Sequence, residues 1–429
     1  MITFRSARIS MMFFIAVAMC AATAQAQGSQ DYIVRFADGA SPADRHGAAV
    51  NAGAAERFIY QGVKAAAVRV PNDQALRRLQ AQAFVVSVVP DRAVSAHQSA
   101  EARGAANPGG GGGGTPAQVT PAGVLRVGAP TSSSNGFGVS VAILDTGIDL
   151  AHADLGGTVN AFSAFGGSCM DDQGHGTHVA GIVGARDNSV GVIGVAPAAT
   201  LYCVKVLDRY GNGSDATIMA GLDWVLANHA AVAPAIRVVN MSLGRPGTVD
   251  DNPSLRDLVA RLDAAGVSIV VSAGNDSSAD VSQQIPAAYA QVTAVASTTA
   301  AGGSNQCRFL SAPIAKDTAS FFTTDGTGVA ISAPGEERED VSRSCIISSV
   351  GILSDKLGGG TTRMSGTSMS APHVTGIIAR YYQQNPSFTP SDVRGCIVVD
   401  ADRPGVAPLD SPASGYTWDG VREGIAQAP

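Results

Sequence analysis

From residue 117 onwards, short apolar runs alternate with longer stretches in which hydrophobic residues recur at helical spacing. Four runs have the length of buried strands: 139–144, 201–207, 238–243 and 268–271. Helices are predicted between and after these runs, over 179–185, 217–227 and 255–265. This alternation predicts an α/β fold, a doubly wound parallel sheet with helices on both faces.

An earlier segment, residues 27–98, has a pattern of its own. Strands are predicted at 31–36, 57–60, 64–70 and 84–89. Ser41 and Pro42 open a first helix as its cap and first-turn residue, and 72–82 forms a second helix. The order predicts a small α+β unit of the split βαβ type.

The N-terminal residues 1–26 have the pattern of a secretory signal peptide. Two arginines precede the apolar run 11–22, and Ala26 ends a small-residue cleavage site. The run is too short to span a membrane, and no other stretch is long enough. We therefore expect an exported protein, secreted or periplasmic, without stable membrane insertion. Cys20 raises the alternative of a lipoprotein, which Met19 before it disfavours.

Residues 99–116 consist mainly of Ala, Gly, Ser and Pro, with glycine at every position from 109 to 114. Such a segment buries no side chains, so it is predicted to be a flexible linker. It would join the small unit to a large domain at 117–429.

Composition limits the possible partners. The chain has 429 residues, 45% hydrophobic and 15% charged, which suffices for a large core and a smaller module. Its net charge is −6, and no run of Lys or Arg is present, which argues against nucleic acid as a partner.

A candidate nucleophile lies where a turn of small residues runs into an apolar helix. Ser368 stands at this point, and Gly366 allows the backbone to approach a bound substrate closely. The helix would direct its free N–H groups at the reacting centre. The alternative is a plain helix cap, because serine is favoured at any helix start.

Three upstream residues supply what a serine nucleophile needs. Asp145 ends the strand 139–144, at the sheet edge where active sites of α/β proteins lie. His175 stands between two glycines at a helix start and is a candidate base. Asn275 follows the strand 268–271 and can offer its amide to an oxyanion.

The blocks Asp145-Thr146-Gly147, Gly174-His175-Gly176-Thr177-His178 and Gly366-Thr367-Ser368-Met369-Ser370, in this order, resemble the subtilisin-like serine peptidases. The resemblance covers about residue 117 to the C-terminus. It implies that Asp145, His175 and Ser368 form a triad, and that Asn275 forms an oxyanion hole with the Ser368 backbone N–H.

By this resemblance the protein would be a secreted serine endopeptidase that works through an acyl-enzyme and acts as a monomer on proteins or peptides. The alternative is a catalytically inactive binding module with the same fold; such proteins usually lack a triad residue, and this chain lacks none. The physiological substrate and the side-chain preference do not follow from the sequence.

The position of the unit at 27–98 resembles the family's inhibitor-type propeptide, which implies a self-processing zymogen with its own propeptide as partner. The alternative is an independent small domain. If it is a propeptide, the first cut is expected near His97 or Gln98.

In the family, peptide binds as an added strand between two segments. The counterparts of these two segments are Gly211, Asn212 and Gly213, and Ser242, Leu243 and Gly244. Ala273 and Gly274 would form the wall of the pocket for the residue before the cleaved bond, and Asp215 and Ile218 would line a more distant pocket. The acidic Asp215 would favour a basic side chain. Without the triad, these glycines would be ordinary turn residues.

The resemblance also implies a structural calcium ion, while catalysis needs no cofactor. The ligands would be side chains of Gln118, Asp154 and Asn188 with carbonyls of Arg186, Val190 and Val192. The alternative is a loop without metal. His178 and His373 are interpreted as structural, and the absence of an HExxH motif gives a zinc mechanism no support.

Removal of Cys20 with the signal peptide leaves five cysteines, an odd number. Cys307 and Cys345 lie in polar insertions and are the first choice for a disulfide. Cys203 and Cys396 have apolar neighbours and are predicted to be buried thiols. No CxxC spacing indicates a metal-thiolate site.

Overall fold

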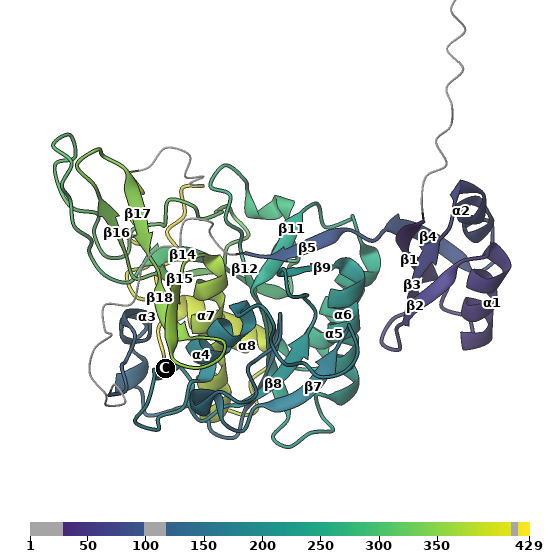
Figure 1. Ribbon diagram of the computed structural model, residues 1–429, viewed down its shortest axis with the longest axis horizontal. Helices are drawn as coiled ribbons and strands as arrows, with labels where there is room; N and C mark the ends of the chain where they lie inside the picture. Colours follow the sequence, from purple (N-terminus) through teal and green to yellow (C-terminus); the bar gives the residue numbers. More distant parts are fainter. Residues whose placement is uncertain (1–28, 98–116, 413–418) are drawn as a thin grey trace, which may run out of the picture.

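The computed structural model describes residues 29–97, 117–412 and 419–429. The predicted signal peptide and linker lie outside these residues, as does Gln98. Figure 1 shows a small N-terminal module beside a larger domain, and the strand β5 (Ala93–Ala96) runs from the module into the domain.

The module has the predicted split βαβ architecture. Its antiparallel sheet has the order β2-β3-β1-β4, and two helices cover one face. The elements are β1 (Gln30–Phe36), α1 (Pro42–Ala52), β2 (Ala55–Ile59), β3 (Ala65–Val70), α2 (Asp73–Gln80) and β4 (Val85–Pro90). Ser41 caps α1 as predicted, because its hydroxyl accepts a hydrogen bond from the Asp44 N–H.

The large domain is built on a seven-stranded parallel sheet, which confirms the predicted α/β fold. In sheet order its strands are β15 (Ile331–Glu336), β14 (Val292–Thr299), β12 (Ser268–Ser272), β10 (Ile236–Met241), β6 (Ser140–Asp145), β8 (Thr200–Lys205) and β7 (Val159–Ser163).

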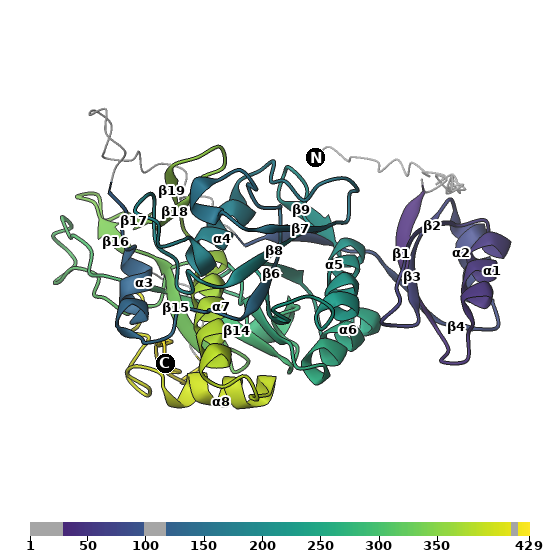
Figure 2. The same cartoon turned by 90° about the horizontal axis from the view of Figure 1, so that it is seen from below.

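Helices cover both faces of this sheet. On one face lie α4 (His175–Gly184) and α7 (Thr367–Gln384), and on the other α5 (Asp215–Asn228) and α6 (Pro253–Ala264), between the sheet and the module in Figure 2. Successive residues of β6 point to opposite faces, so Ile143 belongs to one hydrophobic cluster and Leu144 to the other.

Shorter elements surround this core. They are α3 (Ala122–Arg126), η2 (Ala129–Thr131), η3 (Ala153–Leu155), β9 (Asn212–Ser214), β11 (Leu243–Pro246), η4 (Val281–Gln283), β13 (Gln284–Ile285), the hairpins β16 (Arg338–Val341) with β17 (Ile347–Val350) and β18 (Ile352–Asp355) with β19 (Thr361–Met364), and α8 (Pro390–Val399).

Two disulfides are present among the described residues. Cys307 pairs with Cys345, as predicted. The prediction of a buried thiol at Cys203 was wrong, because β8 brings this residue against Cys169, 34 positions earlier, and the two form a disulfide. Cys396 is free but only partly buried, since it lies on the terminal helix α8.

Among the described residues, no helix combines the length and apolar character that crossing a membrane requires.

Candidate active site

The three residues of the predicted triad come together at the carboxyl edge of the sheet. Asp145 is the last residue of β6, His175 the first of α4, and Ser368 the second of α7. The close approach of α4 to β6 requires glycine: a Cβ on Gly176 would lie 2.1 Å from the carbonyl oxygen of Gly147. A turn and two helix starts thus position the site.

Asp145 and His175 form a fully buried pair. The histidine Nδ1 lies 2.8 Å from Asp145 Oδ1, which also accepts a hydrogen bond from the Thr146 N–H at 2.7 Å. A carboxylate at Nδ1 holds the proton there and leaves Nε2 free to accept one. In the described part of the chain this Nε2 is buried and has no hydrogen-bond partner.

Ser368 is fully buried, and its hydroxyl donates to the carbonyl oxygen of Ser242 at 3.0 Å. Its backbone N–H is one of the free donors at the start of α7. The unpartnered base and the serine held on a neighbouring carbonyl fit a site in which catalytic hydrogen bonds tighten only during reaction.

Two donors converge on one carbonyl oxygen, that of His97 at the end of the described module tail. Asn275 Nδ2 donates to it at 2.7 Å, and the Ser368 N–H at 3.4 Å. The Asn275 amide is held in this orientation because its oxygen accepts from both the N–H and the hydroxyl of Thr367, each at 2.9 Å. This arrangement can stabilise a negative charge on the bound oxygen.

The tail that carries His97 lies as an added strand between two segments of the domain. β5 pairs antiparallel with β9 on one side and β11 on the other (Figure 1). Beyond β5, the His97 N–H donates to Ser242 O at 3.3 Å, and the Ala96 N–H donates to Gly211 O at 3.1 Å. The chain therefore occupies the site with its own extended backbone.

The structure brings most of the predicted substrate residues to this tail. The carbonyl oxygens of Gly211 and Ser242 accept N–H groups of the tail, as described. Asn212, Gly213, Leu243 and Gly244 pair with the tail in the sheet, and Gly244 also lies next to the His97 side chain. Ile218 shares a hydrophobic cluster with Val94 of the tail. Ala273 and Gly274 follow β12 and lie beside Asn275 in the chain.

Asp215, predicted to be an acidic partner for substrate, is paired within the domain in this structure. Both its carboxylate oxygens accept from the Arg245 guanidinium at 2.8 Å, and the side chain is fully buried. Asn252 donates to it as well, at 3.1 Å. Arg245 lies 30 positions away and already neutralises the charge, which the sequence pattern did not show.

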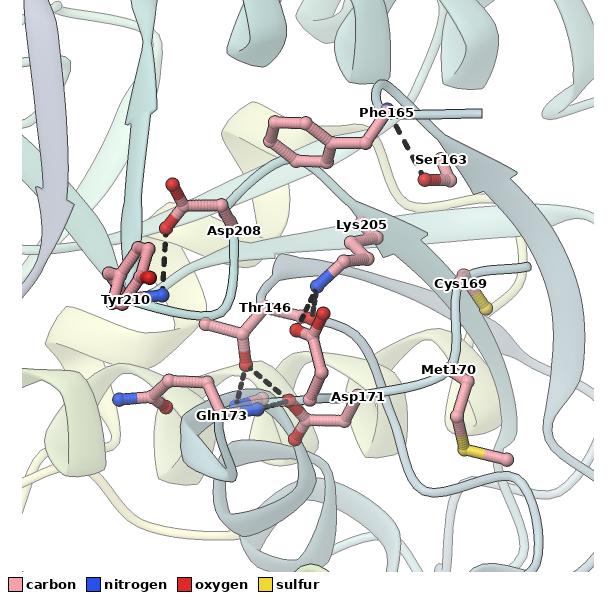
Figure 3. Close-up of polar contacts among 12 residues, drawn as sticks. Thr146, Ser163, Phe165, Cys169, Met170, Asp171, Gln173, Lys205, Asp208 and Tyr210 are labelled. Atoms are coloured by element: carbon pink, nitrogen blue, oxygen red, sulfur yellow. Dashed lines mark hydrogen bonds and ion pairs between the residues drawn. The ribbon is translucent and has the colours of Figure 1, made fainter. Parts of the chain in front are cut away.

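One positioning residue, Asp171, was missed. Its Oδ1 accepts from the N–H groups of Gln173 and Gly174 and from the Thr146 hydroxyl, all at 2.9–3.0 Å, as Figure 3 shows in part. Its Oδ2 accepts from the N–H and hydroxyl of Thr177. This buried carboxylate thus accepts the Thr177 N–H in the first turn of α4 and the Gly174 N–H just before it, which helps to fix the start of the helix that carries His175. The sequence feature that could have indicated this role is an acidic residue four positions before His175.

The strand β8, next to the strand that ends at Asp145, also supports this region. Lys205, at the end of β8, donates to Asp172 at 2.7 Å and to the carbonyl oxygen of Thr146 (Figure 3). The carbonyl of the residue after Asp145 is thus tied to the neighbouring strand.

The two other histidines near the site are structural, as interpreted. Burial lowers the pKa of His178 to about 3 and that of His373 to about 4, so both are neutral at pH 7. His178 Nε2 lies 3.0 Å from the carbonyl oxygen of Ile352, and His373 Nδ1 lies 2.7 Å from that of Met369.

The predicted calcium loop lies around the carboxylate of Asp154. The Gln118 amide nitrogen donates to the carbonyl oxygens of Arg186 at 2.6 Å and of Val192 at 3.0 Å. Asp154 is buried, and its Oδ1 has no hydrogen-bond partner in the described chain. The Asn188 amide nitrogen donates to the carbonyl oxygen of Ala153. The carbonyl oxygens and the carboxylate are ligand types that a hard cation such as calcium takes, whereas the Gln118 and Asn188 amides present their nitrogens to the loop.

No group of three or more His, Cys, Asp and Glu side chains is arranged to hold a metal within the described ranges. A second buried carboxyl, that of Asp355, lies beside Asp154.

Comparison with known proteins decides the family. The profile of the Subtilase family matches residues 136–416. This chain belongs to the subtilase family. M-protease of Shouchella clausii (strain KSM-K16) is 37% identical over 286 residues, which cover 65% of this chain and 64% of the relative.

Two further similarities agree. Subtilisin Savinase of Lederbergia lenta is 37% identical over 284 residues, 65% of this chain and 90% of that protein. A crystal structure of a cold adapted subtilisin-like serine proteinase has a TM-score of 0.54 and 29% identity, and the match covers 70% of this chain and 91% of that one.

Proposed function

We propose that this subtilase is a secreted serine endopeptidase that is made as a self-processing zymogen. The observation that carries the proposal is the position of the His97 carbonyl, whose oxygen accepts from Asn275 and from the Ser368 N–H while β5 lies as an added strand between β9 and β11. This position of a peptide carbonyl at the Ser368 backbone supports attack by a serine on a bound peptide.

In the proposed reaction, Ser368 Oγ attacks the substrate carbonyl carbon while His175 takes its proton at Nε2. Asp145 keeps the other ring proton on Nδ1 and stabilises the imidazolium. Asn275 and the Ser368 N–H bind the negative oxygen, and His175 then protonates the leaving amine. Water, activated by the same histidine, hydrolyses the acyl-enzyme to release the second product.

The N-terminal module acts in this proposal as an inhibitory propeptide. Its tail fills the strand position that substrate would take, and its last described carbonyl meets both oxyanion donors. The first cut, after His97, would then be intramolecular, and the released module would remain bound as a product-like inhibitor until it is degraded.

A fluorophosphonate probe tests the chemistry. We expect the processed protein to be labelled at Ser368 and Ser368→Ala to lose about 10⁶-fold in kcat. Ser370→Ala is the matched control, because it removes another buried hydroxyl of α7 that has no hydrogen-bond partner among the described residues. A folded, propeptide-free protein that resists labelling and cleaves no peptide would instead be an inactive binding module.

The zymogen proposal has its own test. Ser368→Ala should accumulate as a precursor that retains Asp31, while the unaltered chain should process at a rate independent of its concentration. N-terminal sequencing identifies the cut. Self-processing of purified Ser368→Ala would remove Ser368 from the mechanism.

We also infer that the loop around Asp154 holds a structural calcium ion, which stabilises the fold and takes no part in catalysis. Binding to the folded state alone raises its stability, by about 2.7 kcal/mol when calcium is at 100 times its Kd. EDTA should therefore lower the melting temperature of the protein and have little effect on Asp154→Asn. Equal melting with and without EDTA would contradict the metal.

A further inference from the structure

The side chain of His97 makes a specific polar contact. Its Nδ1 lies 2.8 Å from the hydroxyl oxygen of Ser272, the last residue of β12. Ser272 is fully buried. Its hydroxyl thus meets the side chain that stands directly before the bond proposed to be cut.

A glycine makes room for the imidazole ring on a second side. A Cβ placed on Gly244 would lie 2.5 Å from His97 Cε1 and 2.8 Å from Nε2, closer than atoms can approach. The ring therefore packs against the β11 backbone, where any other residue would collide with it. Together, Ser272 and Gly244 define what we call the histidine subsite.

The ring in this subsite is neutral. Burial, together with the nearby charge of His175, lowers the pKa of His97 to about 4. A neutral imidazole has one donor and one acceptor nitrogen, and a serine hydroxyl can match either. The phenyl ring of Phe has a similar width but no nitrogen, so it would leave the Ser272 hydroxyl buried beside an apolar ring.

We propose that Ser272 makes this enzyme selective for peptides with histidine immediately before the cleaved bond. The proposal rests on the peptidase function above and names its substrate class. A buried polar group discriminates in this way because a ligand that leaves it unpaired loses binding energy.

The test uses enzyme processed from the full chain and fluorogenic peptides Val-Ser-Ala-Xaa, where Xaa is His, Phe, Leu or Asn. At pH 8 most of the free imidazole is neutral, because its ordinary pKa is about 6.5. We expect kcat/KM for the His peptide to exceed that for the Phe and Leu peptides about tenfold, with Asn between them.

Ser272→Ala should lower the ratio of kcat/KM for His over Phe to near one. Ser268→Ala is the matched control: it makes the same change at the other end of β12, where the hydroxyl pairs with Tyr382 instead. This control should keep the preference even if it costs stability.

Equal or faster cleavage of the Phe peptide, or a His-to-Phe ratio that Ser272→Ala leaves unchanged, would overturn the histidine subsite. The peptidase function would still stand in that case, because cleavage itself is observed. Its own failure looks different: none of the four peptides is cleaved, and Ser368 is not labelled.

Discussion

The N-terminal module and the large domain each contain a sheet, but only the large domain covers both faces of its sheet with its own helices. In the module, α1 and α2 cover one face, where Val34 and Leu79 form a small core. On the other face, Ile33 and Tyr60 belong to the hydrophobic cluster of the large domain. The second face of the module's sheet is therefore buried where the module packs against the large domain.

Polar contacts across this junction point the same way. The carboxylate of Asp223, on α5, accepts from the backbone N–H groups of Gln61 and Gly62 at 2.6–3.1 Å. The Tyr60 hydroxyl donates to the carbonyl oxygen of Ala216, whose own N–H donates to Asp91. The large domain thus covers both faces of its own sheet, whereas one face of the module's sheet is covered by the large domain.

The largest expected effect concerns the folding of the isolated N-terminal module. A fragment of residues 29–97 should be mostly unfolded alone, because a unit of this size with one sheet face uncovered has little core. The fragment should fold when it is mixed with the large domain of Ser368→Ala, from which an added protease has removed the module. Circular dichroism of the two components and of the mixture measures this. A fragment that is fully folded by itself would break the comparison.

A substitution at the shared oxyanion donor comes next. Asn275→Leu keeps the volume but removes the amide that binds the His97 carbonyl. We expect kcat on peptides to fall about 10²–10³-fold with KM nearly unchanged, since the donor acts mainly on the transition state. Inhibition by the module should weaken much less, because its wider docking surface remains. Equal losses in both assays would contradict this separation.

The docking contact at Asp223 should have a smaller effect. Asp223→Ala leaves two module N–H groups without their acceptor, and the inhibition constant of the 29–97 fragment should rise about 10- to 100-fold. Asp223→Asn keeps an acceptor oxygen and should lose less. Activity on short peptides serves as the control and should not change in either variant.

The smallest expected effect concerns the pH dependence of the stability of the large domain. Glu336 and Glu339 are fully buried side by side, and burial, with the neighbouring carboxyl, raises the pKa of Glu336 well above its usual range. The folded state then binds a proton more tightly than the unfolded state, so stability is lost as pH rises above about 4.5.

Glu336→Gln removes this ionisation while its amide can still donate to Glu339. The variant should melt about 2–4 °C higher at pH 8 for each kcal/mol recovered, and the gain should vanish near pH 4. Melting curves across this range measure it. A gain that is constant with pH would point to packing instead.

Much of the catalytic region was predictable because its determinants are local. Apolar runs gave the strands, and the residues at strand ends and helix starts gave Asp145, His175 and Ser368, which the parallel sheet then brings to one edge. The predicted cut near His97 also has a counterpart, since its carbonyl lies at the proposed oxyanion donors. These assignments depend on short patterns in the sequence.

The contacts that were not predicted join side chains that are distant in sequence. Arg245 reaches Asp215 over 30 positions, and Cys203 meets Cys169 over 34. Neither member of a pair carries a local signal of the other, because the partner is chosen by how strands and helices pack.

Periodicity and turn residues act within a few positions, so the sequence was sufficient to predict the α/β class, four strands of the seven-stranded sheet and the helices beside them. The contacts of Asp171 at the start of the His175 helix and of Ser272 with the His97 ring became visible in the folded structure alone. Both contacts depend on the distance between separate elements, and close packing of the whole chain sets that distance.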